Sequence, residues 1–521
     1  MWKSLASRLC VYLPPMPKKV RVRFAPSPTG GLHLGGVRTI LYNYLFAHKN
    51  GGDFVLRIED TDQSRYVEGA EEYIYKCLSW CGLEPDESPL KGGPYGPYRQ
   101  SERKAIYRKY AEQLVEQGNA YYAFDTPQEL EEMRTRYKTD DNPSPQYGHR
   151  LREKMRNSLT LPGEETATLL KNNTPHVIRI KMPVNEEITF TDIIRGEVNF
   201  NSGQSDDKVL LKADGMPTYH LAVVVDDYLM KITHAFRGEE WLPSAPVHIL
   251  LWQYFGWHDD MPQWAHLPLI MKPDGKGKLS KRDGDRLGFP VFAMDWKDPK
   301  TGEMTKGFKE IGFLPEAFNN MLALLGWNDG TEQEIFTREE LVEKFSLERV
   351  HKAGAKFNFE KAKWFNHEWI KRSSDGFLAA ELKKKLGEKG IEGSFDLEKI
   401  CALIKERCSL LPELWENSYF FFETPAEVDL EAVKGKWTNE KTSFFNALTE
   451  SLAASKEYSA ETLKNNFESL AAGKNLKNKD LLLPFRIMLV GKKIGPGVFE
   501  IAEILGAEET IKRIKHVLQL L

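Results

Sequence analysis

The sequence is poor in cysteine, carries little net charge and contains no long apolar run. Five cysteines in 521 residues are too few for a disulfide framework, so we expect core or incidental thiols in a reducing compartment. A formal net charge of −3 excludes attraction of nucleic acid by overall charge, and local basic faces would have to provide any such binding. No apolar stretch approaches the about 20 residues of a membrane span, so we expect no membrane association. A chain of this length predicts two to four domains.

The start of the chain lacks acidic residues, the first of which is Asp53. Residues 1–19 combine basic side chains such as Lys3 and Arg8 with serines and apolar residues. This composition is typical of an organellar transit peptide and predicts a protein of the mitochondrial matrix. An ordinary basic tail is the alternative, because acid-free stretches of this length also arise by chance.

The stretch 20–36, VRVRFAPSPTGGLHLGG, predicts a strand, a tight turn and the start of a helix. Val20, Val22 and Phe24 alternate with two arginines at strand period, and prolines and glycines then force a turn. Residues 37–48 are apolar at helical spacing. A strand, loop and helix with glycines at the helix mouth direct backbone N–H groups and the positive helix end toward a polyphosphate. A glycine-rich turn without function is the alternative for this motif alone.

A second cationic loop, GKGKLSKR, occupies residues 275–282. Lys278 and Lys281 supply point charges and Ser280 supplies a hydroxyl donor, which suits phosphates that depart as pyrophosphate. A solvated run of surface charge is the alternative.

Together these two motifs resemble the signature boxes of class I aminoacyl-tRNA synthetases. The residues HLGG from His33 to Gly36 resemble the HIGH box, and KLSKR from Lys278 to Arg282, about 240 residues later, resembles the KMSKS box. The preceding PSPTG and the sequence RIEDTD from Arg57 to Asp62 narrow the resemblance to the glutamyl and glutaminyl branch. Beyond Lys352 the pattern is almost entirely helical, which is similar to glutamyl enzymes of the bacterial and organellar type, since glutaminyl enzymes of the usual type carry β-barrel anticodon domains.

The resemblance implies an α/β plus all-α architecture, with a class I Rossmann-type catalytic domain and an α-helical anticodon-binding domain. The expected parts are a transit peptide (1–19), the first half of the catalytic domain (20–120), an α/β acceptor-binding insertion (121–205), the second half of the catalytic domain (206–290), a stem-contact region (291–370) and the anticodon-binding domain (371–521). Within the second half, Val209–Leu211 and Leu221–Val225 predict strands of the parallel sheet. His234–Trp241 is expected to enter a helix that runs through Leu251.

The activity that the resemblance implies is ATP-dependent ligation of L-glutamate to tRNA(Glu) through a glutamyl-adenylate. Whether tRNA(Gln) is also charged, for later amidation, stays open. Such chemistry needs no enzyme nucleophile, so the protein supplies positioning and stabilisation of phosphoryl charge. We expect a monomer that uses ATP with Mg²⁺. Some relatives hold zinc in the insertion, but the corresponding stretch 120–125 reads AYYAFD, so we predict no zinc and no protein-bound metal.

By the same resemblance, individual positions receive roles. The predicted catalytic residues are His33, Lys278 and Lys281. The predicted glutamate-binding residues are Arg23, Phe24, Ala25, Glu59, Tyr219, His220, Leu221, Ala222, Val223 and Arg237. The predicted ATP-binding residues are His33, Gly35, Glu240, Trp241, Lys278, Leu279, Ser280, Lys281 and Arg282. Arg407 is the predicted anticodon contact. Arg150, Arg152 and Arg179 are candidates for contact with the tRNA acceptor end, and solvated surface charge is the alternative for each of them.

Two points weaken individual assignments. Many relatives have asparagine where this chain has Val223, so a contact there would use the backbone or packing. Structural ion pairing is the alternative for Arg23 and Arg237.

Two other classes of function compete with this interpretation. One is a nucleotidyltransferase that activates a carboxylic acid without tRNA, for which the helical tail would be idle. The other is a non-enzymatic RNA-binding protein on a decayed synthetase scaffold, against which the retention of His33, Glu59, Lys278 and Lys281 argues.

Overall fold

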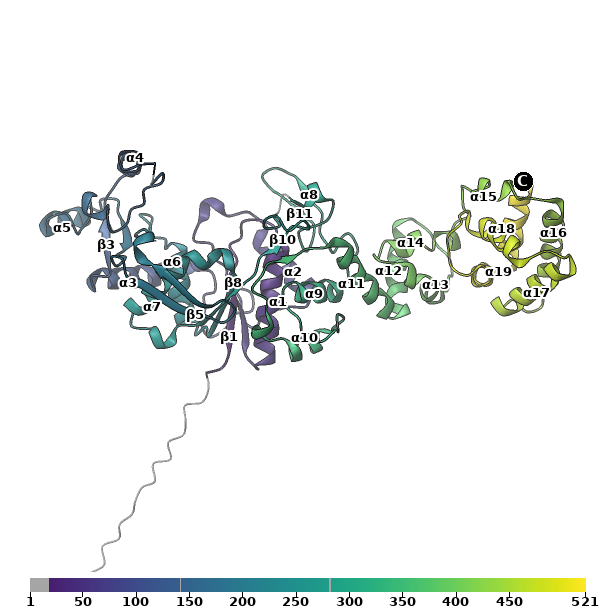
Figure 1. Cartoon of the computed structure of the whole chain (residues 1–521), viewed down its shortest axis with the longest axis horizontal. Helices are drawn as coiled ribbons and strands as arrows, with labels where there is room; N and C mark the ends of the chain where they lie inside the picture. The colour runs from purple at the N-terminus through teal and green to yellow at the C-terminus, as the bar shows by residue number, and fades with distance from the viewer. Residues whose placement is uncertain (1–17, 141, 281–282) are drawn as a thin grey trace, which may run out of the picture. The chain divides into compact units, whose positions relative to one another are not determined.

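The computed structural model describes residues 18–140, 142–280 and 283–521. Their contacts divide the chain into two units (Figure 1), one formed by residues up to Gly307 with Asn319–Asn358, the other by Phe308–Phe318 with Phe359–Leu521. The predictions for residues 1–17, Lys281 and Arg282 lie outside the described residues.

A six-stranded sheet with the order β2-β1-β8-β9-β5-β6 organises the first unit. Its strands are β1 (Arg21–Phe24), β2 (Asp53–Leu56), β5 (Glu187–Asp192), β6 (Gly196–Asn201), β8 (His234–Gly238) and β9 (Gln263–Leu267). All neighbours are parallel except the β5–β6 hairpin. The Rossmann-type catalytic fold is thereby confirmed as a mixed sheet.

The register gives the sheet two different faces. Arg23 lies opposite Val55, Arg237 opposite His266, and Asp192 opposite Trp264. Since side chains alternate between faces, these residues share one face, which α3 (Lys104–Glu116), α6 (Tyr219–Leu229) and α7 (Ala245–Tyr254) cover. The other face is apolar and packs on α1 (Leu34–Lys49).

Two predicted elements have the wrong type. Leu221–Val225 lies in α6 and not in a strand. His234–Gly238 forms the strand β8, and the helix expected to run through Leu251 is confirmed as α7, which begins at Ala245. The five residues of the first run are all buried, and a helix buried all round shows no apolar stripe. A short apolar run therefore fits either structure. In β8, Ala235, Phe236 and Arg237 are buried in succession, as in a strand covered on both faces.

A separate antiparallel sheet of three strands has the order β3-β4-β7. The strands are β3 (Ala120–Ala123), β4 (Val177–Ile180) and β7 (Val209–Leu211), with helices α4 (Pro127–Arg136) and α5 (Gly163–Lys171) in the intervening chain. The strand at Val209–Leu211 is thus confirmed, but its predicted place in the parallel sheet is wrong. The hairpin β5–β6 belongs to the six-stranded sheet, although residues 121–205 were expected to form the insertion.

The remaining elements of the catalytic part are short, apart from α2. They are α2 (Ala70–Cys81), α8 (Asp283–Leu287), α9 (Pro315–Leu324), α10 (Arg338–Lys344), the strand pair β10 (Ile270–Met271) and β13 (Ala355–Lys356), and the pair β11 (Trp296–Lys297) and β12 (Met304–Thr305).

The second unit is helical, as the pattern of the tail predicts. Its helices are α11 (Phe359–Arg372), α12 (Asp375–Glu388), α13 (Leu397–Ile404), α14 (Glu413–Glu416), α15 (Glu431–Lys434), α16 (Asn439–Ala454), α17 (Ala460–Gly473), α18 (Asn478–Val490) and α19 (Val498–Leu520). Aromatic side chains such as Phe444, Phe467 and Phe485 pack at their centre. Across the described part of the chain, no helix has the length and apolar character needed to span a membrane.

Candidate active site

The turn after β1 places His33 at the mouth of α1. His33 Nδ1 accepts a hydrogen bond from the Gly35 N–H over 3.2 Å and caps the helix. Because Nδ1 is the acceptor, the proton of the neutral ring lies on Nε2, which makes that nitrogen a donor. The Leu34 N–H donates to the Val291 carbonyl over 3.0 Å. A Cβ on Gly31 would lie 2.9 Å from the Phe292 ring, so glycine permits this close packing.

The lysine loop is a tight hairpin that follows β10. Leu279 N–H donates to the Ile270 carbonyl over 2.8 Å, and Lys272 N–H donates to the Gly277 carbonyl over 3.1 Å. Gly277 has a φ of +93°, which favours glycine. Lys278 Nζ lies 2.5 Å from Glu240 Oε1, so two predicted ATP-binding residues meet.

These two loops lie at the same edge of the sheet. His33 follows the carboxyl end of β1, and Glu240, the partner of Lys278, follows the carboxyl end of the parallel neighbour β8. Ligands of open α/β sheets bind where carboxyl ends of strands meet. The arrangement is consistent with a triphosphate that touches both loops.

Ser280 is occupied within the lysine loop. Its backbone N–H and hydroxyl donate to Asp283 Oδ2 over 2.9 and 2.6 Å, and Lys272 lies 3.2 Å from the same carboxylate. The hydrogen bond from Ser280 holds the pKa of Asp283 well below its usual range. Ser280 therefore anchors the loop, and its predicted ATP contact stays a prediction.

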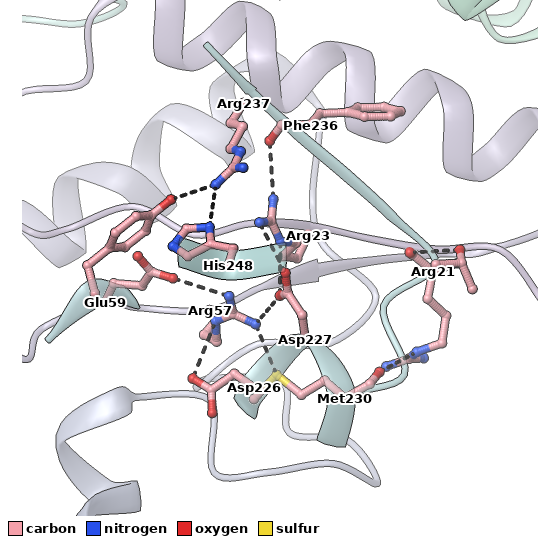
Figure 2. Close-up of polar contacts among 12 residues, drawn as sticks. Arg21, Arg23, Arg57, Glu59, Asp226, Asp227, Met230, Phe236, Arg237 and His248 are labelled. Carbon is pink, nitrogen blue, oxygen red and sulfur yellow. Dashed lines mark hydrogen bonds and ion pairs between the residues drawn. The ribbon is translucent and has the colours of Figure 1, made fainter. Parts of the chain in front are cut away.

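Beneath this edge lies a buried group of charges that we call the aspartate cluster, formed by Arg23, Arg57, Arg103, Asp226 and Asp227. Figure 2 shows Arg57 between Asp226, Asp227 and Glu59. Arg23 Nε lies 3.1 Å and Arg57 Nη1 2.8 Å from Asp227 Oδ1. Arg103 Nε donates to Asp226 over 2.8 Å. Each arginine of the aspartate cluster thus has a carboxylate partner within the protein.

Glu59 lies at the border of the aspartate cluster. Arg57 Nη2 is 3.2 Å and Gln100 Nε2 is 3.4 Å from its carboxylate. Burial raises the pKa of Glu59 to about 7, against the opposing effect of Arg57. A bound ammonium group would favour the ionised form.

Arg237 has a different environment from the other buried arginines (Figure 2). It is 8% exposed, and its N–H groups donate to Tyr219 Oη, His248 Nδ1 and His266 Nε2, each over 3.1 Å. The guanidinium carbon lies 4.7 Å from the centre of the Trp264 ring. Among the described residues Arg237 forms no ion pair, and its Nη2 has no hydrogen-bond acceptor. A buried cation in this state suits an incoming carboxylate.

The other predicted glutamate-binding positions divide into three groups. Tyr219 contacts Arg237, and its ring lies 4.9 Å from that of Trp241, while His220 Nδ1 lies 3.2 Å from His248 Nε2. The remaining members of the segment are core residues of α6: Leu221, Ala222 and Val223. Phe24 ends β1 and Ala25 follows it.

Of the three arginines expected to contact the tRNA acceptor end, two have partners inside the protein, and their contact with tRNA stays a prediction. Arg152 Nη1 lies 3.2 Å from the Asp207 carboxylate, and Arg179 Nη1 donates to the Asp207 carbonyl over 2.9 Å. Both arginines are buried, whereas Arg150 is exposed. Asp207 therefore holds the two buried arginines as structural groups.

Several polar residues that the fold brings to this site carry no role among the residues predicted from the sequence. They are Arg57, Asp192, Asp226, Asp227, His248 and His266. Asp226 and Asp227 directly follow the apolar run VVV, and paired acids after such a run are a signal for a buried ion-pair partner. Nothing in the local sequence distinguishes Asp192 or His266, because only the register of the sheet brings them to Arg237.

Comparison with known proteins agrees with this arrangement along the whole chain. The model of the catalytic domain of class I tRNA synthetases (E and Q) matches residues 19–364, and an anticodon-binding-domain model matches residues 364–518. The glutamate–tRNA ligase of Amoebophilus asiaticus is 50% identical over 97% of this chain and 99% of its own length. That of Christiangramia forsetii is 51% identical over 97% of this chain and 100% of its own length.

A known structure shows the same likeness in three dimensions. The crystal structure of a glutamate tRNA ligase from Elizabethkingia meningosepticum, in complex with its amino acid, matches with a TM-score of 0.93 and 50% identity, and covers 97% of this chain and 100% of that one. With its two signature loops at one sheet edge and a helical region that follows in the sequence, the chain belongs to the glutamate–tRNA ligases of the class I aminoacyl-tRNA synthetases.

Proposed function

We propose that this ligase joins L-glutamate to tRNA(Glu) with ATP, and that Arg237 receives the side-chain carboxylate of the amino acid. One observation carries the proposal: Arg237 is buried and charged, yet it meets only neutral acceptors and has Nη2 left for a ligand. The planar guanidinium matches a carboxylate. Glu59, whose carboxylate becomes ionised near pH 7, is suited to the ammonium group.

Arg23 supports the site in a different way. Its guanidinium is 3.1 Å from Asp227 and donates to the Phe236 carbonyl over 3.1 Å. Arg23 therefore forms the structural ion pair that was the alternative to a binding role, and direct binding of glutamate by this residue stays a prediction.

The chemistry consists of two displacements that the protein organises by position and charge. An oxygen of the α-carboxylate attacks the α-phosphorus of ATP, and the bond to pyrophosphate breaks. A ribose hydroxyl of tRNA then attacks the activated carbonyl, and AMP leaves with the bonding pair. The Nε2–H of His33 is suited to donate to the α-phosphate, and Lys278 to neutralise pyrophosphate after releasing Glu240.

We propose that Mg²⁺ binds together with ATP. Within the described ranges no cluster of three or more His, Cys, Asp or Glu side chains could hold a metal ion. Mg²⁺ commonly keeps its waters and binds through substrate phosphates and one or two carboxylates. When bound, it would neutralise phosphate charge, and Glu240, which lies beside Lys278, could supply a carboxylate ligand.

ATP–pyrophosphate exchange with each amino acid, with and without tRNA, tests the proposed function. We expect exchange with glutamate only, and only when tRNA is present. His33→Ala should slow this exchange about 100-fold because a donor to developing charge is lost. Exchange without RNA would instead indicate a carboxylate-activating nucleotidyltransferase, and no exchange under any condition would indicate an RNA-binding protein.

The range of tRNAs is a separate proposal that concerns Arg407. This residue is exposed at the end of a 3₁₀ turn (Lys405–Arg407), where it can reach a base edge. An arginine that pairs with a base edge separates correct from incorrect bases by about 1–3 kcal/mol. Charging of tRNA(Glu) and tRNA(Gln) by the wild type and by Arg407→Ala would show whether both are substrates and whether Arg407 discriminates between anticodons.

Location and assembly complete the proposal. The acid-free, basic composition of residues 1–19 supports a mitochondrial matrix protein, and the catalytic-domain match begins at residue 19. Fusion of this segment to a fluorescent protein tests import, with a fusion lacking it as the control. We propose a monomer, which sedimentation equilibrium would test.

A further inference from the structure

Arg237 determines which ring nitrogen carries the proton in two neighbouring histidines. An arginine N–H only donates, so His266 Nε2 and His248 Nδ1, which face it at 3.1 Å, must both be unprotonated. Neither imidazole can become charged without losing its bond to Arg237. The arginine therefore fixes one tautomer at each histidine.

Each imidazole donates its own proton away from Arg237. The proton of His266 lies on Nδ1, which is 2.6 Å from the Asp192 carboxylate. The proton of His248 lies on Nε2, which is 3.2 Å from His220 Nδ1. Two chains of hydrogen bonds thus begin at the guanidinium, one ending at Asp192 and the other at His220.

The chain through His266 ends on a rigid anchor. Asp192 Oδ1 accepts from the N–H groups of Ile194 and Arg195 over 2.9 and 2.8 Å. Its Oδ2 accepts from the backbone N–H of His266 over 3.1 Å. The side chains of Asp192 and His266 are both fully buried. The position of the imidazole is therefore set by backbone groups of β9 and of the turn after β5.

Burial favours the neutral form of both histidines. It lowers the pKa of His266, and it lowers the pKa of His248 well below the ordinary value. Neutral imidazoles orient the guanidinium but do not neutralise it. A carboxylate in either place would neutralise Arg237 before any substrate arrived, as Asp227 does at Arg23.

We propose that His266, anchored by Asp192, and His248 are positioning residues that hold Arg237 charged and uncompensated, and that they thereby set the preference for glutamate over glutamine. This inference rests on the proposed role of Arg237. A glutamate carboxylate neutralises the guanidinium, whereas the neutral carboxamide of glutamine would leave a buried charge unpaired. A site with an unpaired buried group rejects the wrong ligand strongly.

Matched substitutions at position 266 separate positioning from packing. In His266→Gln the side-chain carbonyl reaches the place of Nε2 and can accept from Arg237. In His266→Asn the amide reaches only the place of Nδ1 and keeps the contact with Asp192. We expect His266→Asn to raise the KM for glutamate about tenfold or more, with kcat and the KM for ATP nearly unchanged. His266→Gln should restore most of the loss.

At position 248 the effects of the two substitutions should be exchanged, because there Nδ1 is the atom that accepts from Arg237. His248→Asn is expected to keep the KM for glutamate near that of the wild type, and His248→Gln to raise it. This second pair decides the matter if a variant at position 266 fails to fold. His234→Gln is the control, since His234 lies on β8 but on the opposite face, against Phe46 of α1. It should leave all constants unchanged.

The readout is aminoacylation of tRNA(Glu) by the full-length enzyme, with glutamate and ATP varied separately and glutamine present as a competitor. Equal effects of Asn and Gln at both positions would overturn the positioning role, as would a loss confined to kcat. Arg237→Met separates a failure of the proposed glutamate contact at Arg237 from a failure of the positioning role of the histidines. If it leaves the KM for glutamate unchanged, Arg237 is not the receptor and the proposed function of this residue fails as well. If it raises that KM while the crossed pattern is absent, only the positioning role fails.

Discussion

Arginines on the same face of the six-stranded sheet occur in two opposite electrostatic environments. In the aspartate cluster, Arg23 and Arg57 lie 3.1 and 2.8 Å from the Asp227 carboxylate. Arg237, on the neighbouring strand, meets two imidazoles, a phenol and an indole ring. A charge that is neutralised inside the protein stabilises the fold, whereas an uncompensated charge is available to a ligand. The counter-ion of a buried arginine, more than its position, therefore indicates its role.

Removal of a carboxylate from the aspartate cluster should have the largest effect. Asp226 accepts from Arg103 over 2.8 Å, from Tyr107 over 2.8 Å and from Gln100 over 2.9 Å. Asp226→Ala removes the acceptor of these donors and one of the three carboxylates around Arg57, and we expect the free energy of unfolding to fall by about 3–5 kcal/mol. Urea denaturation measures this change.

Lys76→Ala is the control for that experiment, because Lys76 and Glu72 form an exposed pair on α2. Exposed pairs contribute little to stability, so the variant should unfold like the wild type. A similar fall in the free energy of unfolding in both variants would mean that the buried Asp226 carboxylate stabilises the fold no more than an exposed ion pair does.

Arg237→Met should affect glutamate binding strongly and stability only slightly. The KM for glutamate should rise about 30-fold or more, because a buried charge pair with the substrate is lost. The free energy of unfolding should change by about 1 kcal/mol or less, since no protein carboxylate loses its partner. Steady-state kinetics and urea denaturation of the same preparation measure both quantities. A large loss of stability with unchanged kinetics would place Arg237 with the structural arginines.

A further effect depends on pH and concerns Glu59, at the border of the two environments. Its pKa is raised by burial to about 7 in the folded protein, from an ordinary value of 4.5. The folded state then binds more protons than the unfolded state between these values, so the contribution of Glu59 to stability is present below pH 4.5 and is lost as the pH rises to about 7. Glu59→Gln should remove this decline.

The difference in unfolding free energy between wild type and Glu59→Gln, measured from pH 4.5 to 8, isolates that contribution. The variant should gain relative to the wild type as the pH rises. In the wild type, the KM for glutamate should fall over the same range, because the ionised carboxylate binds the ammonium group. A difference that stays constant with pH would show that Glu59 titrates at its ordinary value.

The two signature loops could be predicted from sequence because their geometry depends on local chemistry. Glycines and prolines around His33 and between Lys272 and Lys278 determine the turns, and the loops form as expected. The helical tail was predicted for a similar reason, since each helix carries its own apolar stripe. Element type failed where burial is complete, at Leu221–Val225 and at residues 235–237 of β8, because a segment covered on all sides has no periodic pattern.

The residues around Arg237 could not be predicted because they meet only through the register of β5, β8 and β9. Asp192, Arg237 and His266 come from three strands, and a shift of one residue in either pairing would turn one of them to the other face. Arg237 itself was found through family resemblance. Its charge state among neutral neighbours required the coordinates.

The close packing of Gly31 against Phe292 and Trp296 has a consequence for synthesis on the ribosome. The helix mouth is completed by aromatic rings that are translated about 260 residues later. A nascent chain that has not yet reached Trp296 lacks the rings that pack on Gly31. The packing at the mouth of α1 is therefore completed only after more than half of the polypeptide has been made, and a truncated product that ends before Phe292 would lack it.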